Sequence, residues 1–472
     1  MWTPRLVLIL AMKKARRKPT SFIKKFINEG IKFLKIFVSA TSIHGLIHFT
    51  GPRIHLIERM LWLISFVLCL YGATILSLST WKRYQETPTV ISMERNWKDW
   101  NTSFPSITIC PTEKYDELAL QELIDTEFKN YTNKEEISNF LIHLANATYF
   151  TFINVPEIGT NIVPPSRYIE FIYRIRFNLR YVLSNSNMEL FNISTLDLTI
   201  TELGICYAYN SRVAIYNSYS YWLSKNWTIL SSDKLIERNP LDGDMFGQIM
   251  NMSSGYYGFI HSPMEAPDIA AYMLFSPSYV FKSIELTALS TYSTSKVKDL
   301  NIEQRKCRFF NESNLITSPV YAYRLCRNEC RMKLAHKLCG CIPHFYRPSY
   351  QYKICDVKGM HCLGQYSELL VKLKDSLTNN KIQCPCHLPC EYTIYVVETE
   401  ENMEWPFGTY IKWSLSKYPR MRLKRDILFG FSDVLVSVGG TFGLFLGSSV
   451  LSFMEILYFF TLRLYLYIMR QS

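Results

Sequence analysis

The sequence has few charged residues, no regular glycine period and no long linker rich in glycine or serine. Only 19% of its 472 residues are charged, whereas 15% are aromatic, so a disordered and strongly solvated chain is excluded. The 19 glycines and 20 prolines follow no period, which excludes collagen-like and low-complexity classes. A chain of this length has room for roughly two to four domains. The sequence therefore predicts a folded protein with a sizeable core.

Sequence signatures of catalysis are also missing. The chain contains neither His-Glu-x-x-His nor Gly-x-Ser-x-Gly, the spacings typical of zinc peptidases and of α/β-hydrolases. Three histidines near the N-terminus, His44, His48 and His55, have no nucleophile beside them, and the later histidines are scattered. We therefore expect no enzymatic activity and no cofactor, and an ectoenzyme is the least favoured alternative.

The net charge of +12 is confined to the two ends of the chain. Residues 1–59 hold twelve Lys and Arg against two Glu, residues 463–472 add two Arg, and the remainder is balanced. A nucleic-acid-binding domain would interleave its basic residues with the fold, so no nucleic-acid partner is expected. The basic cluster at residues 13–18 fits a juxtamembrane segment better than a localisation signal.

Two long uncharged stretches lie just inside these basic ends. Residues 60–81 and 434–454 carry no charged side chain, and each exceeds the ~18–20 residues that a helix needs to cross ~30 Å of hydrocarbon. A buried helix of a globular core is the alternative for either stretch alone. The excess of Lys and Arg before the first stretch places both termini in the cytosol and the intervening residues outside.

We therefore divide the chain into five segments. They are a cytosolic segment at 1–59, a transmembrane helix at 60–81, an extracellular domain at 82–430, a second transmembrane helix at 431–462 and a short cytosolic tail at 463–472.

The cysteines indicate the compartment of the large central segment. Cys69 falls in the first apolar stretch, whereas the other twelve lie in the central segment, ten of them within residues 307–390. Zinc is the competing interpretation, but zinc clusters favour Cys-x2-Cys pairs, which the sequence lacks. The density predicts a disulfide scaffold without a structural metal, and spacing alone leaves the pairing open. Seven sequons there are candidate glycosylation sites: Asn101, Asn130, Asn146, Asn192, Asn226, Asn251 and Asn311.

Apolar periodicity predicts both helices and strands in the central segment. Alternating apolar residues predict strands within 82–110, 201–210 and 255–300, whereas helical spacing predicts helices within 112–150, 320–338 and 364–376.

The second apolar stretch contains four glycines and several hydroxyl side chains between residues 434 and 451. Close packing of helices through small residues is one explanation. A pore is the other, because non-helical backbone at membrane depth is tolerated only where it lines a cavity or is buried in protein. A ring of carbonyl groups could then replace the hydration shell of an ion. Two spans cannot enclose a pore alone, so this interpretation requires an oligomer.

Eight short motifs occur in a fixed order. They are Ser-Ile-His-Gly at 42–45, Glu-Arg-Met-Leu-Trp at 58–62, the strand pattern at 104–110, Gly-Ile-Cys at 204–206, Cys-His-Leu-Pro-Cys at 386–390 followed by Tyr395, Gly-Gly at 439–440, Gly-Leu-Phe at 443–445 and Gly-Ser-Ser at 447–449. This ordered set resembles the degenerin/epithelial sodium channel family, most closely its arthropod pickpocket branch. Residues 125–200 and 210–300 carry little of the resemblance.

The resemblance implies an α+β membrane protein that assembles as a trimer. Two transmembrane helices would flank a large disulfide-rich extracellular domain with a β-sheet palm and helical thumb and finger regions. It assigns the selectivity filter, where sodium permeates, to Gly447, Ser448 and Ser449, the blocker position to Gly443, and gating roles to His44, Gly45, Tyr84 and Val436. It also implies six disulfides: Cys110–Cys206, Cys307–Cys390, Cys326–Cys386, Cys330–Cys384, Cys339–Cys362 and Cys341–Cys355.

The sequence departs from the family pattern at three places. Val436 stands where the family keeps a small residue, and bulk there favours an open channel. The thumb tip before Cys307 lacks the Trp-Gly of acid-sensing members, so acid gating is not expected. The short segment after the second span lacks the Pro-rich ubiquitin-ligase motif of epithelial members.

Together these features predict a sodium-selective, amiloride-sensitive channel subunit in the plasma membrane. Its partners would be membrane lipid, sodium ions and the other subunits of a homo- or heterotrimer, and an unidentified extracellular stimulus would gate it. The alternatives are a two-span, disulfide-rich receptor or adhesion protein and a non-conducting accessory subunit.

Overall fold

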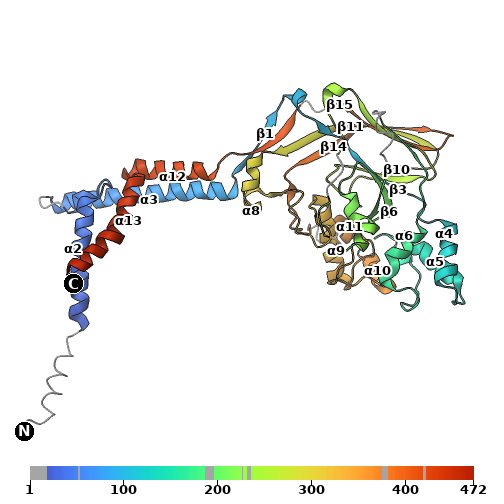
Figure 1. Cartoon of the computed structure of the whole chain (residues 1–472), viewed down its shortest axis with the longest axis horizontal. Coiled ribbons are helices and arrows are strands. Elements are labelled where there is room, and N and C mark those ends of the chain that lie inside the picture. The colour runs from blue at the N-terminus through green and yellow to red at the C-terminus, as the bar shows by residue number, and fades with distance from the viewer. Residues whose placement is uncertain are drawn as a thin grey trace, which may run out of the picture. The chain divides into compact units, whose positions relative to one another are not determined.

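Helices and strands occupy different parts of the chain. A computed structural model describes residues 19–50, 54–185, 196–225, 227–230, 235–374, 381–417 and 421–471. The chain divides into a helical unit, comprising Met1–Thr89 and Ile427–Ser472, and a strand-rich unit, Val90–Asp426. Figure 1 shows the elements of both units.

The helical unit is built from segments at the two ends of the chain. Its helices are α2 (Pro19–Ala40), α3 (Leu56–Glu86), α12 (Phe431–Leu446), α13 (Val450–Tyr458), a π-helix (Phe459–Arg463) and α14 (Leu464–Gln471). Two stretches are long and apolar enough to cross a membrane, Leu56–Glu86 and Val450–Tyr467. At 1.5 Å per residue, the 31 residues of α3 extend about 46 Å, more than the hydrocarbon thickness.

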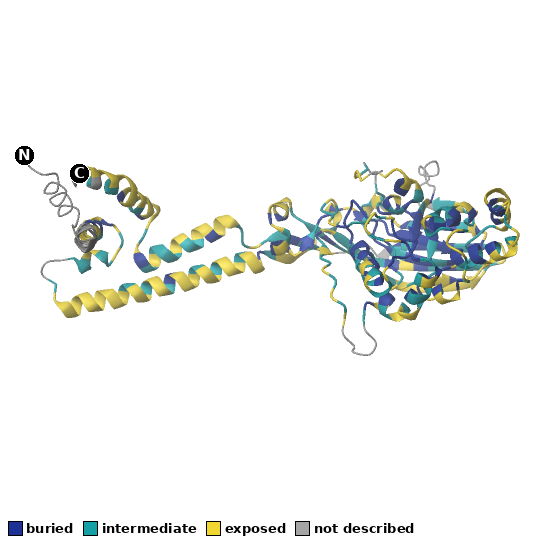
Figure 2. Ribbon diagram, turned by 90° about the horizontal axis from the view of Figure 1, so that it is seen from below, coloured by how far each residue is buried: buried dark blue, intermediate teal, exposed yellow. Residues whose placement is uncertain are grey.

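Helices α3 and α12 lie side by side, and most of their surface is exposed (Figures 1 and 2). Gly72 permits this approach, because a Cβ atom there would lie 3.0 Å from the ring of Phe445. Such small residues are common where membrane helices pack closely. Just after the C-terminal end of α3 and just before the N-terminal end of α12, the two segments are joined by hydrogen bonds. The backbone amides of Leu428 and Phe429 both donate to the carbonyl of Pro88, at 2.8 and 3.1 Å.

A large mixed sheet runs through the strand-rich unit. Strand β11 (Val280–Ser293) pairs antiparallel with β14 and parallel with β15 and β16. The strand order is β1-β16-β11-β15-β8-β4, with β14 also on β11. The other bounds are β1 (Thr89–Glu94), β4 (Val182–Asn185), β8 (Met245–Met252), β14 (Tyr392–Glu404), β15 (Thr409–Lys417) and β16 (Arg422–Ile427).

A second, antiparallel sheet packs against the first through aromatic side chains. Trp413 of β15 is fully buried and lies 5.8 Å from the ring of Phe104 and 5.5 Å from that of Tyr209. Gly247 makes room for it, because a Cβ atom there would overlap the indole. This sheet has the order β10 (Leu274–Ser276), β9 (Tyr256–His261), β3 (Ser106–Pro111), β6 (Gly204–Tyr209) and β5 (Asp197–Thr201). Two short pairs join β2 (Thr102–Ser103) to β7 (Glu237–Arg238) and β12 (Cys307–Arg308) to β13 (Leu388–Pro389).

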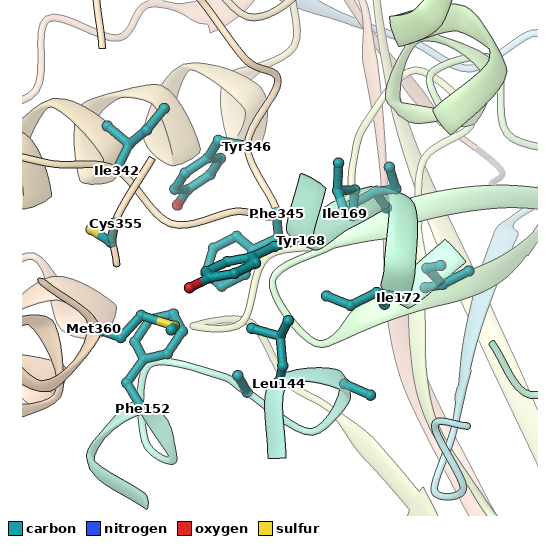
Figure 3. Close-up of a cluster of buried hydrophobic side chains, with 14 of the residues drawn as sticks. Leu144, Phe152, Tyr168, Ile169, Ile172, Ile342, Phe345, Tyr346, Cys355 and Met360 are labelled. Carbon is teal, nitrogen blue, oxygen red and sulfur yellow. The ribbon is translucent and has the colours of Figure 1, made fainter. Parts of the chain in front are cut away.

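Helices cluster around a second core, rich in aromatic side chains. Phe152 and Phe345 stack with their ring centroids 5.9 Å apart, and Tyr168 and Met360 are fully buried beside them (Figure 3). These helices are α4 (Glu117–Glu127), α5 (Lys134–Ala145), α6 (Tyr168–Ile175), α7 (Tyr219–Leu223), α9 (Tyr323–Cys339), α10 (Val357–Gln365) and α11 (Ser367–Lys372), whereas α8 (Ile302–Arg305) lies apart from this core, next to β12. Short 3-10 turns occupy Leu46–Phe49, Trp97–Asp99, Phe152–Asn154, Pro165–Arg167, Ala214–Asn217, Pro240–Asp242 and Ser295–Asp299.

Most predicted elements are confirmed, but two differ from the structure. The helices expected within 112–150 and 320–338 form as α4, α5 and α9, and strands form in all three predicted regions. The helix expected within 364–376 forms only in part: α11 occupies Ser367–Lys372 and ends before the left-handed Leu373, while α10 begins earlier, where Asp356 accepts a hydrogen bond from the Gly359 amide. The strand-like interpretation of residues 82–86 is wrong, since α3 continues to Glu86.

Six disulfides stitch the strand-rich unit together. They are Cys110–Cys206, Cys307–Cys390, Cys326–Cys386, Cys330–Cys384, Cys339–Cys362 and Cys341–Cys355, the pairs that the family resemblance implies. Two of them tie α9 to the segment at 384–386, and a third joins its last residue to α10. Cys69 on α3 is a free thiol.

Candidate functional site

The apolar helix near the C-terminus is interrupted at Gly447, Ser448 and Ser449. Helix α12 ends where Gly447 turns left-handed with φ of 59° and its amide donates to the Gly443 carbonyl at 2.9 Å. Helix α13 begins at Val450, directly after Ser449, whose hydroxyl accepts a hydrogen bond from the Ser452 amide at 3.4 Å. The three predicted filter residues therefore form a short non-helical link between two apolar helices. The Ser448 hydroxyl is buried without a partner among the residues that the structure describes.

The predicted His-Gly motif lies directly against this link. The His44 amide donates to the Leu446 carbonyl at 3.0 Å, satisfying one of the carbonyls left free at the end of α12. The His44 ring is so close to Gly447 that a Cβ atom there would overlap it. Gly45, with φ of 90°, then turns the chain toward α3, where a Cβ atom on it would meet Phe66 and Trp62. The structure thus brings together two motifs about 400 residues apart in the sequence.

Polar contacts continue this junction toward α13. The Ser42 amide donates to a carboxylate oxygen of Glu455 at 3.0 Å, and the hydroxyls of Ser42 and Ser452 lie 2.7 Å apart. Ser452 is 2% exposed, whereas most of the surrounding helix surface is open. We call the contacts of Ser42 with Ser452 and Glu455 the serine clip. It fastens the segment before α3 to the helix after the filter link.

Aromatic side chains extend the same contact to the C-terminal end. The ring of Phe37 on α2 lies 5.3 Å from that of Phe459 and 5.2 Å from that of Phe460. Phe33, one turn earlier, lies 5.3 Å from Tyr467. Phe459 opens the π-helix, a wide turn that often marks functional sites in helices. Helix α2 therefore packs across the π-helix and α14.

The other predicted pore residues lie on α12 and α3. An added Cβ atom would meet nothing at Gly439 or Gly440 and only the Ser448 carbonyl, at 3.6 Å, at Gly443. Val436 is 74% exposed, so within one chain it touches little. The Tyr84 ring lies 6.5 Å from that of Phe431, the first residue of α12.

Sequence reasoning missed the serine clip. In the sequence, Ser42 is part of the Ser-Ile-His-Gly motif and Glu455 is the charged residue that directly follows the uncharged stretch at 434–454. The usable signal was Glu455 itself, because an ionisable residue inside a membrane helix is costly and marks a functional contact.

In the strand-rich unit, the largest buried charge cluster surrounds Arg331 of α9. This fully buried guanidinium pairs with Glu202, between β5 and β6, and with Asp268 at 2.9 Å. Burial alone would raise the pKa of Asp268, but the guanidinium groups of Arg331 and Arg327 hold it below its usual value. The Tyr346 hydroxyl donates to the same Glu202 carboxylate. The cluster fastens α9 to the second sheet.

Two histidines of this unit are buried and neutral. His344 and His261 are each 3% exposed, and burial lowers the pKa of each to about 4. His261 shares a hydrogen bond of 2.8 Å with the Thr108 hydroxyl. The Nδ1 atom of His344 has no partner among the described residues, and the ring lies between aromatic side chains, 5.4 Å from that of Phe345.

The sequons of the strand-rich unit lie at its surface where the structure describes them. The side chains of Asn101, Asn130, Asn146, Asn251 and Asn311 are all exposed. Asn192 and Asn226 lie outside the described residues. Within the described part of the chain, no three His, Cys, Asp or Glu side chains are placed to hold a metal ion.

Comparison with known proteins points to one family. A family profile described as "Amiloride-sensitive sodium channel" matches residues 37–459. The Drosophila melanogaster "Sodium channel protein Nach" is 24% identical over 91% of this chain and 86% of its own length. "Pickpocket protein 11" of the same fly is 24% identical over 91% of this chain and 76% of its own. The mouse "Bile acid-sensitive ion channel" is 22% identical over 91% and 88%.

Proposed function

The chain belongs to the amiloride-sensitive sodium channel family, and from this premise we propose that it is a pore-forming subunit of a sodium-selective, amiloride-sensitive cation channel in the plasma membrane. Relatives named as sodium, pickpocket and bile acid-sensitive channels support a cation channel subunit. Sodium selectivity, block by amiloride and gating by an extracellular stimulus are proposed here in addition to what the names of these relatives support.

The observation that carries the proposal is the non-helical link at residues 447–449. Its backbone stands between two apolar helices, where free carbonyl groups are tolerated only around a cavity or inside protein. Carbonyl and hydroxyl oxygens in such a ring could replace the water around a sodium ion. Each chain supplies one link, so several copies must surround the pore, and we propose three. The partners are then related subunits or further copies of this chain, in lipid.

Gating would reach this link from both sides of the membrane. The strand-rich unit, with its six disulfides, suits an oxidising extracellular location and would receive the stimulus as palm, thumb and finger regions. Both termini would lie in the cytosol, where His44 and Gly45 support the filter from behind. Tyr84 would couple the extracellular region to the membrane helices.

Sodium current in cells that express the full chain tests the proposal. We expect a current that amiloride blocks and that Gly443 substitutions desensitise to the blocker. The Ser449→Ala variant should change the sodium-to-potassium permeability ratio by about tenfold, because it removes one hydroxyl oxygen of the link and the cap that this oxygen provides to α13. The matched control is Ser65→Ala, which removes an exposed hydroxyl from α3. A chain that reaches the surface but passes no current, alone or with related subunits, contradicts pore formation and favours a receptor or an accessory subunit.

Val436 provides a second test of the same proposal. Because this position favours a small residue in the resembling family, Val436→Ala should lower the basal current several-fold at equal surface amount. An unchanged basal current would show that the bulk of Val436 does not hold the channel open.

A further inference from the structure

Ser449, the last residue of the non-helical link, is held by a side chain of the helix that follows it. Its backbone amide donates to the Ser452 hydroxyl at 3.1 Å, and its own hydroxyl accepts from the Ser452 amide at 3.4 Å. This reciprocal arrangement is a capping box, in which the residue before a helix and the third residue of the helix satisfy each other's amides. The position of the Ser449 backbone therefore depends on the Ser452 hydroxyl.

The Ser452 hydroxyl has a further partner outside its own helix. It lies 2.7 Å from the Ser42 hydroxyl, whereas the Ser449 hydroxyl is farther away, at 3.5 Å. A hydroxyl group has one proton to donate and two lone pairs that accept. Because the Ser449 amide uses one lone pair of the Ser452 oxygen, the other lone pair and the proton are available to Ser42. The Ser42 contact thus holds the Ser452 hydroxyl in the orientation that the Ser449 amide requires.

Ser42 is itself fixed by a second contact. Its backbone amide donates to a carboxylate oxygen of Glu455 at 3.0 Å, so Ser42 contacts α13 through both its main chain and its side chain. Two residues later, the His44 amide donates to the Leu446 carbonyl at the end of α12, at 3.0 Å. The short segment from Ser42 to His44 therefore contacts the helix before the link and the helix after it.

We infer that Ser42 and Ser452 are positioning residues of the selectivity filter, which hold the Ser449 backbone in place through one chain of hydrogen bonds. The inference rests on the proposed function, because it takes residues 447–449 as the filter. It goes further, because it makes the segment before α3 a determinant of which ion passes. Selection depends on the oxygens that replace the hydration shell of the ion, and such groups must be held within about 0.5 Å of their working positions. A link that is free to shift would therefore discriminate less between sodium and potassium.

The sodium-to-potassium permeability ratio in cells that express the full chain tests this inference, because the ratio does not depend on how many channels reach the surface. Ser452→Ala should lower the ratio about threefold to tenfold, the effect that loss of one hydrogen bond typically produces. Ser42→Ala should lower it as well, whereas Ser42→Thr, which keeps the hydroxyl, should leave it at the unmodified value. The matched control is Ser39→Ala, which removes an exposed hydroxyl that donates to the Ile36 carbonyl within the same helix.

A double variant separates one chain of contacts from two independent effects. If Ser42 acts through Ser452, then Ser42→Ala combined with Ser452→Ala should change the ratio no more than Ser452→Ala alone, because residues of one network are not additive. Unchanged ratios in both single variants overturn the inference. A double variant whose effect is the product of the two single effects overturns it too.

Hydrogen exchange distinguishes failure of this inference from failure of the proposed function. In the purified full chain in nanodiscs, the Ser449 amide should exchange faster in Ser42→Ala and in Ser452→Ala than in the unmodified chain or in Ser39→Ala, because its acceptor is displaced or lost. Equal exchange in all four proteins overturns the positioning role, whether or not the chain conducts. Faster exchange in a chain that passes no current supports the positioning of the link and contradicts the proposed function alone.

Discussion

Gly447 shows how one residue can decide whether the non-helical link at residues 447–449 forms. Its φ of 59° is open to glycine but costs other residues about 1–2 kcal/mol, and a side chain there would also enter the His44 ring. Both the backbone strain and the overlap with His44 arise at Gly447, the residue where α12 ends and the link begins. We therefore expect Gly447→Ala to reduce sodium current at least tenfold while the protein still reaches the surface. Whole-cell current and surface biotinylation measure the two quantities.

The control for Gly447→Ala is another added methyl group in the helical unit. A Cβ atom at Gly30 of α2 would meet nothing within contact distance, so Gly30→Ala should leave the current unchanged. Equal currents for Gly447→Ala and the unmodified chain would show that the link adapts to a side chain.

His344 makes the stability of the strand-rich unit depend on pH. Its folded pKa is about 4, below the 6.5 of an exposed histidine. Between these values the unfolded chain binds the extra proton, so stability is complete above pH 6.5 and falls as the pH approaches 4. The loss should be on the order of 3 kcal/mol for this side chain. His344→Phe should keep the aromatic packing and make the melting-temperature profile between pH 6.5 and 4 less steep, whereas His261, whose pKa is also about 4, keeps its own contribution to the slope.

His143→Phe serves as the comparison for this profile, because that histidine is partly exposed. The profile should keep its slope in His143→Phe. If His344→Phe follows the unmodified chain at every pH, protonation of His344 does not limit acid stability.

At the scale of elements, α9 is held by a charge cluster as well as by disulfides. Removing Arg331 would leave Glu202 buried without its cation and Asp268 with Arg327 alone, and breaking a buried ion pair typically costs about 3–5 kcal/mol. Arg331→Leu should lower thermal stability accordingly. Replacing all three residues by Leu should recover most of the loss, because no buried carboxylate then lacks a cation and Arg327, which loses Asp268, is partly exposed to solvent.

Lys372→Ala on α11 is the comparison for Arg331→Leu. Its side chain is 61% exposed and pairs with Glu368, which is 60% exposed, so its loss should cost below about 1 kcal/mol. Equal destabilisation by the two variants would mean that the Arg331 cluster adds nothing beyond a surface pair. Differential scanning fluorimetry of the purified variants makes the comparison.

The sequence predicts elements well where one interaction dominates. Helices α4 and α5 could be predicted from their periodic apolar residues, and α9 from the spacing of its cysteines. The two candidate membrane stretches could be predicted from their lack of charge between basic ends. The boundary at Leu373 was hidden, because a left-handed leucine has no sequence signature. The contact of His44 with Gly447 was hidden too, because it joins distant segments through backbone atoms. Motif recognition named both residues without placing them together.

At the scale of the whole molecule, charge and glycans should report the same topology. An N-terminal epitope tag should bind antibody only after the cells are permeabilised, because we expect the excess of basic residues to keep that end in the cytosol. Each Asn→Gln substitution at an exposed sequon that carries a glycan should lower the apparent mass on a gel by the mass of that glycan. Antibody labelling of intact cells would reverse the assignment.

Within the helical unit, the segments that follow α3 and precede α12 share one hydrogen-bond acceptor, the carbonyl oxygen of Pro88. Because the amides of Leu428 and Phe429 both donate to the Pro88 carbonyl, the segments leaving α3 and entering α12 are yoked rather than independent. Sliding one segment past the other would break both hydrogen bonds, at roughly 1–3 kcal/mol in total, whereas swinging them together breaks neither. A force on either segment is therefore shared by both helices. Forces that act on both segments in the same direction move α3 and α12 together, whereas opposed forces are resisted by the two hydrogen bonds.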